Sequence, residues 1–394
     1  MLRCHNVEDV RAAARRRLPS PIFHYLDGGA DDEWSLSNNV DRFDRYSLIP
    51  QQMTGITDID ITANLLGIRS SMPLILSPTG MSRLFHHRKE HAVAKAASDA
   101  NIIYSLSTLA STKMEDIAAT SSGAKIFQIY IMRDRELTRE FLERARDSGY
   151  NALCVTVDTP VGGNRERDLK TGMIMPPRFT AASLASFITS PYWSLNYLRD
   201  RKFSIANIEH RIKSFGSGAM SPVAFVNGQI DGNATWDDVA WLAREWNGPF
   251  IVKGVLTPQD SRRALAAGAT AIMISNHGGR QLDHTPAPID CVRPIRDAIG
   301  SDAQIIVDGG IRRGSSIIKA IALGADACSI GRPYLYGLAA AGAAGVTRVL
   351  EMFRSEINRS MVLMGKRDLA SLNSSDVEDI DSVVTRSTRF KPEV

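Results

Sequence analysis

Residues 304–314 read Gln304-Ile305-Ile306-Val307-Asp308-Gly309-Gly310-Ile311-Arg312-Arg313-Gly314. This stretch is a short run, apolar on both faces, that ends in a polar tail rich in glycine. Such a pattern is typical of a strand in a buried parallel sheet at the point where the strand passes into a loop. A strand of this kind needs parallel neighbours, so the rest of the chain should contain further runs of the same type.

Seven more runs of this type occur, which makes eight in the whole chain. They span residues 73–77, 102–105, 125–130, 152–158, 249–253, 271–275 and 326–331. The intervals between runs contain helix-like stretches, for example 90–100, 137–148 and 258–267. Eight alternating strand and helix units predict an α/β protein with a closed (β/α)8 or TIM barrel over about residues 73–365. A doubly wound open sheet is the structural alternative.

Two parts of the chain lie outside this alternation. A helical and irregular extension of roughly 70 residues precedes the first run. An insertion of about ninety residues, 159–248, follows the fourth strand and is far longer than an ordinary βα loop. Loops at this end of a barrel cover the catalytic face, so we expect the insertion to form a lid or a partner surface. We treat residues 1–394 as a single domain.

Composition and charge exclude several classes of protein. The 394 residues carry 47 basic and 43 acidic side chains, and a net charge of +4 is too balanced for a nucleic-acid-binding protein. The four cysteines are scattered without a CxxC pair, which indicates a reducing compartment. We find neither a secretory signal nor a run of about 18 apolar residues, so the expected location is the cytoplasm.

Polar residues follow the apolar runs at the strand ends that a barrel gathers on one face. They are Gln128, Tyr130, Thr156, Asp158, Lys253, Ser275, His277, Arg280, Asp308, Arg312 and Arg332. The glycine-rich tails after the seventh and eighth strands, with Arg312 and Arg332, predict a phosphate site. His277 is the acid–base candidate with Asp158 as its orienting carboxylate, and Arg165 with Arg280 could hold a substrate carboxylate.

The tail Ser275-Asn276-His277-Gly278-Gly279-Arg280-Gln281-Leu282-Asp283 resembles the signature of the FMN-dependent 2-hydroxy-acid dehydrogenase and oxidase family. This family includes glycolate oxidase, quinone-linked L-lactate dehydrogenase and mandelate dehydrogenase. Further matches follow in the same order between residues 7 and 365: Tyr25 with 28–30, then 77–80, 106–108, 127–130, 156–160, 253–254 and 308–314. The resemblance implies an FMN enzyme, tetrameric and without a catalytic metal, that oxidises an (S)-2-hydroxy acid to the 2-keto acid.

The resemblance also implies a role for each matching residue. His277 takes a proton from the substrate, and Asp158 stabilises the imidazolium that results. The substrate is bound by residues of three kinds, namely the clamping Arg165 and Arg280, the assisting Tyr25, and Tyr130 at the hydroxyl. Lys253 lies near the flavin N1, where a cation stabilises the reduced ring. The remaining FMN contacts are Pro78, Thr79, Gly80, Ser107, Gln128, Thr156, Ser275, Asp308, Gly310, Arg312, Gly331 and Arg332.

Two residues, Leu109 and Gly80, and two segments bear on the substrate and the electron acceptor. Leu109 stands where some members of the family have a bulky aromatic, which suggests a pocket wider than one for glycolate. Residues 161–168 are similar to mandelate dehydrogenase and the segment around 191–193 to bacterial lactate dehydrogenases, so lactate, mandelate and related acids all stay open. Gly80 stands where oxidases commonly carry Ala, which implies a quinone-like acceptor. An oxidase that uses oxygen is the alternative.

Other interpretations compete for parts of the chain. His87-Arg88-Lys89-Glu90-His91 matches the H-x-x-E-H pattern of a zinc protease group, although no third ligand suggests itself. A phosphate-binding barrel or an FMN-dependent isomerase would share the phosphate tails. In the segment 184–203, Tyr192, Trp193 and Tyr197 adjoin Arg199, Arg201 and Lys202. This pattern favours either peripheral contact with the inner face of a membrane or a lid or oligomer contact packed on the barrel.

Overall fold

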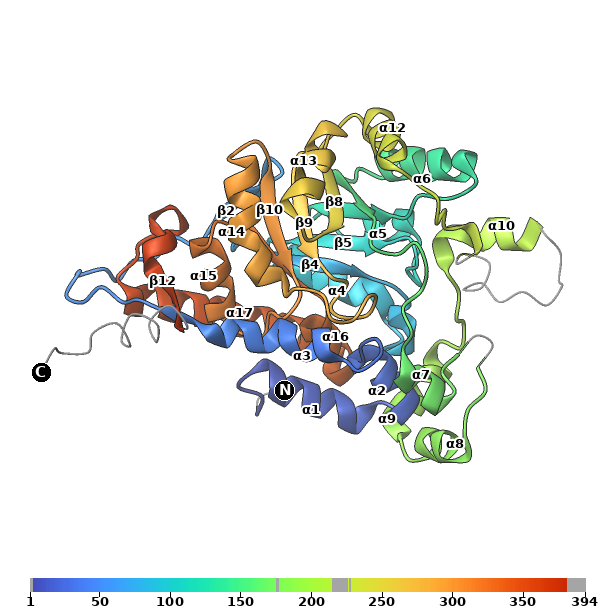
Figure 1. Cartoon of the computed structure of the whole chain (residues 1–394). Helices are drawn as coiled ribbons and strands as arrows, with labels where there is room; N and C mark the ends of the chain where they lie inside the picture. The colour runs from blue at the N-terminus through green and yellow to red at the C-terminus, as the bar shows by residue number, and fades with distance from the viewer. Residues whose placement is uncertain (1–2, 175–176, 215–225, 227, 381–394) are drawn as a thin grey trace, which may run out of the picture.

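The computed structural model describes residues 3–174, 177–214, 226 and 228–380, and a closed parallel barrel lies at its centre (Figure 1). In barrel order the strands are β10 (Gln304–Asp308), β11 (Ala327–Ile330), β4 (Leu74–Thr79), β5 (Ile103–Ser107), β6 (Lys125–Ile129), β7 (Ala152–Thr156), β8 (Phe250–Val255) and β9 (Ala271–Ser275). Each of the eight predicted runs forms one of these strands. The predicted TIM barrel is confirmed, and the open-sheet alternative is wrong.

Helices cover the outside of the barrel. They are α4 (Lys89–Asp99), α5 (Met114–Thr120), α6 (Arg135–Asp147), α12 (Trp236–Trp246), α13 (Pro258–Ala266), α14 (Pro288–Ile299), α15 (Gly314–Ala322), α16 (Arg332–Ala341) and α17 (Ala343–Met364). Local sequence explains their bounds: α6, for example, begins after Asp134, whose carboxylate accepts hydrogen bonds from the N–H groups of Glu136 and Leu137. Its apolar residues Phe141 and Leu142 are buried against the barrel layer.

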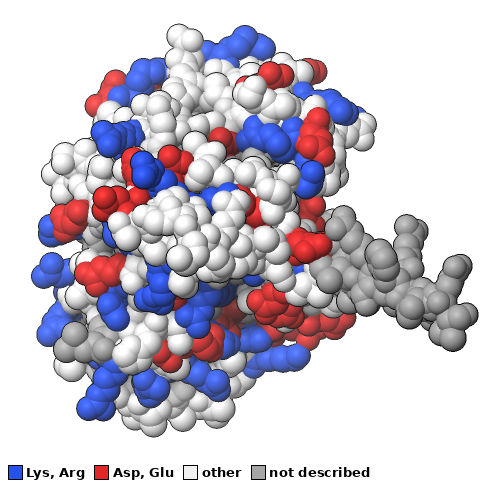
Figure 2. Space-filling view, turned by 90° about the vertical axis from the view of Figure 1, so that its left-hand side faces the viewer, with Lys and Arg blue, Asp and Glu red and all other residues white. Residues whose placement is uncertain are grey.

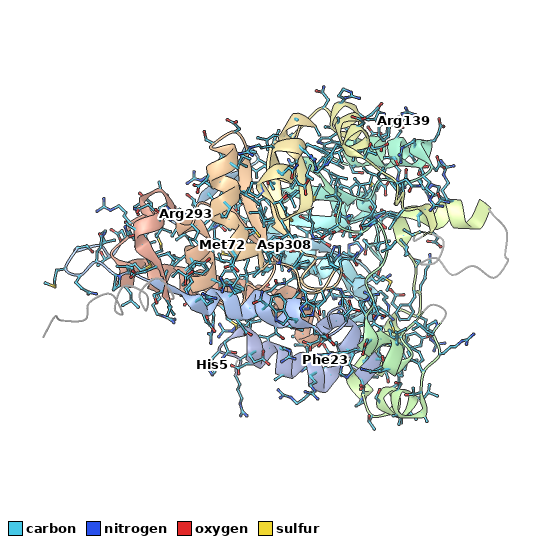
Figure 3. All side chains as sticks on the ribbon, in the orientation of Figure 1. His5, Phe23, Met72, Arg139, Arg293 and Asp308 are labelled. Carbon is cyan, nitrogen blue, oxygen red and sulfur yellow. The ribbon has the colours of Figure 1, made fainter. Side chains whose placement is uncertain are left out.

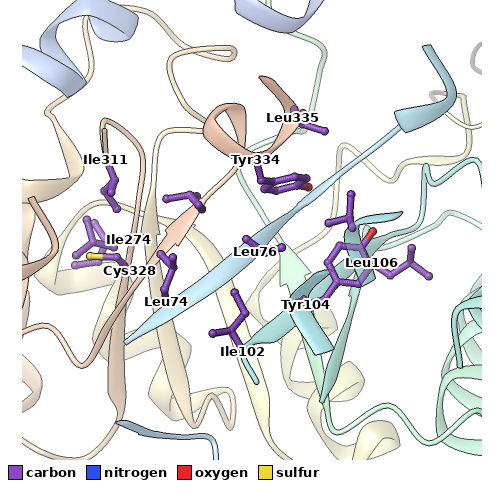
Figure 4. Close-up of a cluster of buried hydrophobic side chains, with 14 of the residues drawn as sticks. Leu74, Leu76, Ile102, Tyr104, Leu106, Ile274, Ile311, Cys328, Tyr334 and Leu335 are labelled. Carbon is purple, nitrogen blue, oxygen red and sulfur yellow. The ribbon is translucent and has the colours of Figure 1, made fainter. Parts of the chain in front are cut away.

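The strands are apolar on both faces because each face packs against a different part of the core. Leu74 and Leu76 belong to the outer cluster that packs under the helices (Figure 4), whereas Ile75 between them belongs to a second cluster. This second cluster lies at the amino ends of the strands. The hairpin of β2 (Ala63–Leu65) and β3 (Ile68–Ser70) contributes Leu65 to it, with only 1% of that residue exposed.

The N-terminal extension and the end of the described chain meet each other. The extension contains α1 (Val7–Arg17), α2 (Ser20–Asp27) and α3 (Trp34–Asp41), and α1 packs against α16. Its short strand β1 (Tyr46–Leu48) pairs antiparallel with β12 (Val377–Asp379), so the chain beyond residue 365, which the resemblance did not cover, returns to the extension. One core cluster holds side chains from Cys4 to Val377, which supports our proposal that the chain forms one domain.

The insertion after β7 folds into short helices. They are α7 (Glu166–Thr171), α8 (Ala181–Ile188), α9 (Pro191–Arg199), the 3-10 turn Ala206–Ile208 and α10 (Glu209–Ser214), while residues 175–176, 215–225 and 227 of the insertion lie outside the described residues. Trp193 is buried and its Nε1 donates to the carbonyl of Leu84 at 2.7 Å. Of the two interpretations of this segment, Trp193 fits the one in which it packs on the barrel.

The surface agrees with the balanced composition. Figure 2 shows basic and acidic side chains interspersed on one face of the molecule. Among the described residues, no helix is both long enough and apolar enough to cross a membrane.

Candidate active site

The carboxyl ends of the barrel strands surround a cavity of about 570 Å³. Most of the predicted site residues line it, namely Tyr25, Pro78, Thr79, Gly80, Ser107, Tyr130, Arg165, Lys253, His277, Arg280, Asp308, Gly310, Arg312, Gly331 and Arg332. Asp308 lies near the middle of the molecule in Figure 3. The other four predicted residues, Gln128, Thr156, Asp158 and Ser275, lie behind this lining and hydrogen-bond to it or to one another.

An imidazole and a carboxylate form a pair on one side of the cavity. His277 Nδ1 lies 2.9 Å from Asp158 Oδ1, and the Asp158 side chain is mostly buried. Burial acts to raise the pKa of Asp158, but the charges of His277 and Lys253 and the hydrogen bond from His277 outweigh it and lower that pKa. The carboxylate is thus ionised beside the imidazole, and it can stabilise a positive charge that forms there.

Two arginines of the cavity lining converge on the ring of Tyr25. The guanidinium carbons of Arg165 and Arg280 each lie 5.2 Å from the ring centre of Tyr25. Burial, together with the charge of Arg165, lowers the pKa of Arg280 to about 10, which still leaves it protonated at neutral pH. Two guanidinium groups on one cavity wall form a binding site for a carboxylate.

Arg165 has an acidic partner that sequence reasoning did not assign. Its Nε lies 3.1 Å from Oδ2 of the buried Asp168, which also lines the cavity. Burial raises the pKa of Asp168, and Arg165 and Arg280 oppose that rise. The spacing of three residues between Arg165 and Asp168 on the α7 turn was the available signal.

One of the residues that line the cavity is a buried lysine. Lys253 Nζ donates to Ser275 Oγ at 3.0 Å and lies 3.3 Å from Asp308 Oδ2. Burial alone would lower the pKa of Lys253, but Asp308 and Asp158 raise it above its ordinary value, so the ammonium stays charged. Ser77, which had no predicted contact role, donates to Asp308 Oδ1 at 2.5 Å.

Side chains from three adjacent strands form a hydrogen-bonded row. Ser107 Oγ donates to Gln128 Oε1 and Gln128 Nε2 donates to Thr156 Oγ1, both at 2.9 Å. Tyr130 lies beyond this row, and burial raises the pKa of Tyr130 to about 12. Its hydroxyl is therefore protonated at neutral pH and can donate a hydrogen bond into the cavity.

The ends of β10 and β11 have the features of a phosphate site. A Cβ added to Gly310 would lie 1.8 Å from the carbonyl oxygen of Asn39, so only glycine fits there. Gly331 caps the amino end of α16 without a side-chain cap, which leaves backbone N–H groups free for an anion. Arg332 donates through its two Nη atoms to Gly278 O and Gly28 O, both at 2.8 Å, and its buried Nε has no partner within the described part of the chain. Together with Arg312, this donor set fits the phosphate of FMN.

The zinc-protease pattern serves a different purpose in the structure. Glu90 is buried and accepts hydrogen bonds from Ser82 N at 3.2 Å, Ser111 N at 2.9 Å and Thr112 Oγ1 at 2.6 Å. Its carboxylate therefore anchors loops around the first two barrel strands. The described residues contain no group of three or more His, Cys, Asp or Glu side chains that could hold a metal ion.

The features of a phosphate site at two adjacent strand ends, together with a buried cation and an imidazole–carboxylate pair, are those expected of a flavin-dependent oxidoreductase on a TIM barrel. The family model described as FMN-dependent dehydrogenase matches residues 14–379, and the chain belongs to this family. Its cofactor is FMN, and the chemistry of the family is the oxidation of 2-hydroxy acids.

Known proteins resemble the chain over nearly its whole length. It is 38% identical to glycolate oxidase of Spinacia oleracea over 94% of this chain and 95% of that protein. It is 37% identical to a putative L-lactate dehydrogenase of Mycobacterium tuberculosis over 95% of this chain and 89% of that protein. A crystal structure of the monotopic membrane protein (S)-mandelate dehydrogenase superimposes with a TM-score of 0.91 at 35% identity, over 96% of this chain and 100% of the other.

Proposed function

We propose that the chain oxidises an (S)-2-hydroxy acid of the lactate or mandelate type and passes the electrons to a quinone-like acceptor. The observation that carries this proposal is the 2.9 Å contact between His277 and Asp158 in a cavity that also contains Arg165 and Arg280. An acid–base pair and a carboxylate clamp in one cavity match a substrate whose hydroxyl and carboxylate stand on adjacent carbons.

Each side chain of this site has one task. Arg165 and Arg280 bind the substrate carboxylate, with Tyr25 between them, and Tyr130 donates to the substrate oxygen. His277 takes a proton from the substrate, and Asp158 stabilises the imidazolium. Two guanidinium groups that bind the same carboxylate fix its orientation and restrict its rotation.

Bound FMN supplies the acceptor for the two electrons that the substrate loses. The residues that would hold its phosphate are Gly310, Arg312, Gly331 and Arg332, and Asp308 would contact the ribityl chain. Those that would contact the ring system are Pro78, Thr79, Gly80, Ser107, Gln128, Thr156 and Ser275. Lys253 is the buried cation beside them, and its pairing with Asp308 keeps it charged.

The test is anaerobic addition of (S)-lactate, (S)-mandelate and glycolate to the yellow holoenzyme, followed by flavin absorbance. The (S)-enantiomers of lactate or mandelate should bleach the flavin, and the (R)-enantiomers should not. Retention of the yellow colour with every (S)-2-hydroxy acid tried would show that the proposed reaction is wrong.

The cavity wall favours a substrate with an apolar side chain over glycolate. Leu109, Met173, Ile205 and Ile230 line it, and the last three come from the insertion. Apolar lining adds affinity in proportion to the apolar surface that the substrate buries. The relatives named as mandelate dehydrogenase and mandelate oxidase support this choice. In the same bleaching assay, glycolate should therefore have the lowest second-order rate constant for flavin reduction of the three acids.

The electron acceptor is inferred from Gly80. A Cβ added there would lie 2.8 Å from Leu109 Cβ and 3.1 Å from Leu109 O, so a methyl group at this position would displace Leu109. We expect the reduced enzyme to react slowly with oxygen and rapidly with a soluble quinone. Reoxidation by each acceptor, measured in wild type and in Gly80→Ala, tests this proposal, and rapid turnover of the wild type on oxygen alone would identify an oxidase.

We also propose that the insertion docks on a membrane surface and that the protein is a homotetramer, as the family resemblance implies. Leu184 and Ile188 of α8 and Leu195 and Leu198 of α9 are exposed large apolar residues, with 83% of Ile188 exposed. Apolar side chains beside Arg199, Arg201 and Lys202 are suited to an anionic lipid surface. The relative described as a monotopic membrane protein supports this proposal.

The docking test is co-sedimentation with vesicles that contain anionic lipid, at low salt. Wild type should sediment, whereas Ile188→Glu with Leu195→Glu should not. Leu363→Glu is the matched control because Leu363 is 66% exposed on α17, away from the insertion. Light scattering of the same proteins gives the oligomeric state. Wild type that stays in the supernatant would exclude the membrane contact.

A further inference from the structure

Gln281 joins the two loops that carry the proposed catalytic and clamping residues. The β9 loop (276–283) carries His277 and Arg280, and the β7 loop (157–165) carries Asp158 and Arg165. Gln281 Nε2 donates to the carbonyl of Asp158 at 3.1 Å and to that of Val161 at 2.8 Å. Its Oε1 accepts from the N–H of Gly163 at 3.1 Å. A single side chain of the β9 loop thus holds three backbone groups of the β7 loop.

The two loops are also in direct backbone contact at Gly163. A Cβ added to Gly163 would lie 2.2 Å from the carbonyl oxygen of Arg280 and 2.9 Å from Gln281 Cα, so no larger residue fits. Gly163 precedes Arg165 by two residues, and its contact with Arg280 therefore limits how far apart the backbone segments that carry the two guanidinium groups can lie. The hydrogen bond that Gly163 N donates to Gln281 Oε1 holds this contact together.

The β9 loop needs such a tie because its backbone is strained. His277, Gly278 and Gly279 all have positive φ, at 56°, 67° and 71°. For His277 this conformation is unfavourable by itself and persists only where neighbouring contacts hold it. His277 N also donates to Ser275 Oγ at 3.0 Å, which anchors one side of the turn, and Gln281 anchors the other.

We propose that Gln281 is a positioning residue for both parts of the site. Through the Asp158 carbonyl it holds the carboxylate that meets His277, and through Gly163 it sets the spacing of Arg165 and Arg280. This inference rests on the proposed function, since those four residues matter only if they transfer the proton and bind the carboxylate. Gln281 acts through the β7 backbone, so its loss should affect kcat and ligand affinity together.

The structure offers a matched control at the opposite end of the barrel. Gln304 Nε2 donates to Asn64 O at 2.8 Å, and Gln304 Oε1 accepts from Leu66 N at 2.7 Å. Gln304 thus ties a barrel strand to a backbone segment just as Gln281 does, but far from the cavity. Replacing each with Met, which has a similar length and no N–H donor, removes the same kind of interaction from the two ends.

The experiment compares Gln281→Met and Gln304→Met as holoenzymes. Measurements are the anaerobic flavin reduction rate, the primary deuterium isotope effect with α-deuterated substrate, and the Kd of oxalate, a dicarboxylate without an α-hydrogen, from flavin absorbance. Gln281→Met should reduce flavin about 10²-fold more slowly and bind oxalate about tenfold more weakly, because small displacements of reacting groups have effects of this size. The isotope effect should rise towards its full value. Gln304→Met should lower the Tm by about as much as Gln281→Met does. Its rate of flavin reduction should equal that of the wild type.

A second variant guards against a folding defect in the first. Gln281→Glu keeps the length and the oxygen that faces Gly163 N but lacks the two N–H donors. It should therefore reduce flavin almost as slowly as Gln281→Met does. Wild-type rates in both Gln281 variants, or equal losses in Gln304→Met, would overturn the positioning role. If no hydroxy acid reduces the wild type but oxalate affinity still depends on Gln281, the proposed function fails while the spacing of the arginines stands.

Discussion

The two ends of the barrel are built from the same strands and differ in almost every other respect. At the amino end the interior side chains are apolar, among them Ile75, Ile126 and Ile306, and the β2–β3 hairpin closes this end with Leu65. At the carboxyl end the strands lead into charged and polar groups around a cavity, with Lys253 and Asp308 both buried. The amino end is thus a packed apolar core, and the carboxyl end surrounds the candidate active site.

This difference shows how the fold divides stability from chemistry. Burying charges is unfavourable unless each has a partner, and at the carboxyl end Lys253 pairs with Asp308 and Asp158 with His277. Such pairs roughly offset their own desolvation and contribute little net stability. The amino end carries less of this burden: its buried Lys125 donates to the carbonyls of Ser121 and Gly123. The well-packed apolar layer there stabilises the barrel that holds the site in place.

The largest difference between the two ends of the barrel should appear when the proposed base, His277, is replaced. His277→Gln should slow anaerobic flavin reduction about 10³-fold, since proton transfer by a positioned side chain accelerates a reaction by a factor of this order. FMN content should stay at the wild-type level because the imidazole is assigned to the proton and not to the cofactor. His284→Gln is the control, because His284 is 64% exposed and stacks on Trp34 near the end of the same loop. Equal rates for His277→Gln and wild type would end the assignment of the base.

The reverse experiment weakens the amino end. Leu65→Ala should reduce the free energy of unfolding by about 3 kcal/mol, the typical effect of truncating a fully buried leucine. Denaturant unfolding measures this loss, and the rate of flavin reduction at 25 °C should not change. A parallel drop in that rate would mean that packing at the amino end reaches the site, and the comparison would fail.

Much of the fold was predictable because its signal is local. An apolar run with a polar tail describes one strand completely, and eight repeats leave few arrangements other than a barrel. The strand ends also lie on one face by topology alone, so His277, Arg280, Lys253 and Asp308 could be placed together without knowledge of any distance.

The missed features depend on contacts between distant segments. The sequence around Trp193 allows either a membrane contact or packing on the barrel, and only the hydrogen bond to the carbonyl of Leu84 shows that the ring faces inward. Asp168 and Ser77 are ordinary polar residues until the fold places them against Arg165 and Asp308. The pairing of β1 with β12 joins segments more than three hundred residues apart, and neither segment has a strand pattern of its own.

The extension that covers the carboxyl end gives a pH-dependent prediction. Asp27 accepts from Arg11 Nε at 2.6 Å and from the hydroxyl of Tyr336 at 2.7 Å, which joins α2 to α1 and α16. Burial acts to raise the pKa of Asp27, but these two hydrogen bonds lower it to about 2. In the unfolded chain the value is about 3.9, so the carboxylate form favours folding by about 2.5 kcal/mol. This stabilisation is fully present above about pH 4 and is lost as the pH falls towards 2.

The measurement is denaturant unfolding of wild type and Asp27→Asn between pH 6 and pH 3. The difference between the two proteins should be largest at pH 6 and should shrink as the pH falls. Asp99→Asn serves as the control, since the ion pair of Asp99 with Lys95 is exposed and worth at most about 1 kcal/mol. A difference for Asp27→Asn that stays constant over this range would assign its effect to packing and not to charge.

The smallest expected effect comes from two adjacent arginines that face different parts of the molecule. Arg312 lines the cavity, whereas Arg313 pairs with Glu356 at 2.8 Å and has 53% of its side chain exposed. Arg312→Ala should weaken FMN binding about thirtyfold, equivalent to about 2 kcal/mol for one charge-assisted hydrogen bond to the phosphate. Arg313→Ala removes the same charge one residue away and should change FMN affinity by less than about twofold, as expected for an exposed ion pair. Both dissociation constants follow from the fluorescence of released FMN on dilution. If the two variants lose FMN equally, the net positive charge at this end holds the phosphate, and the individual contact assigned to Arg312 is wrong.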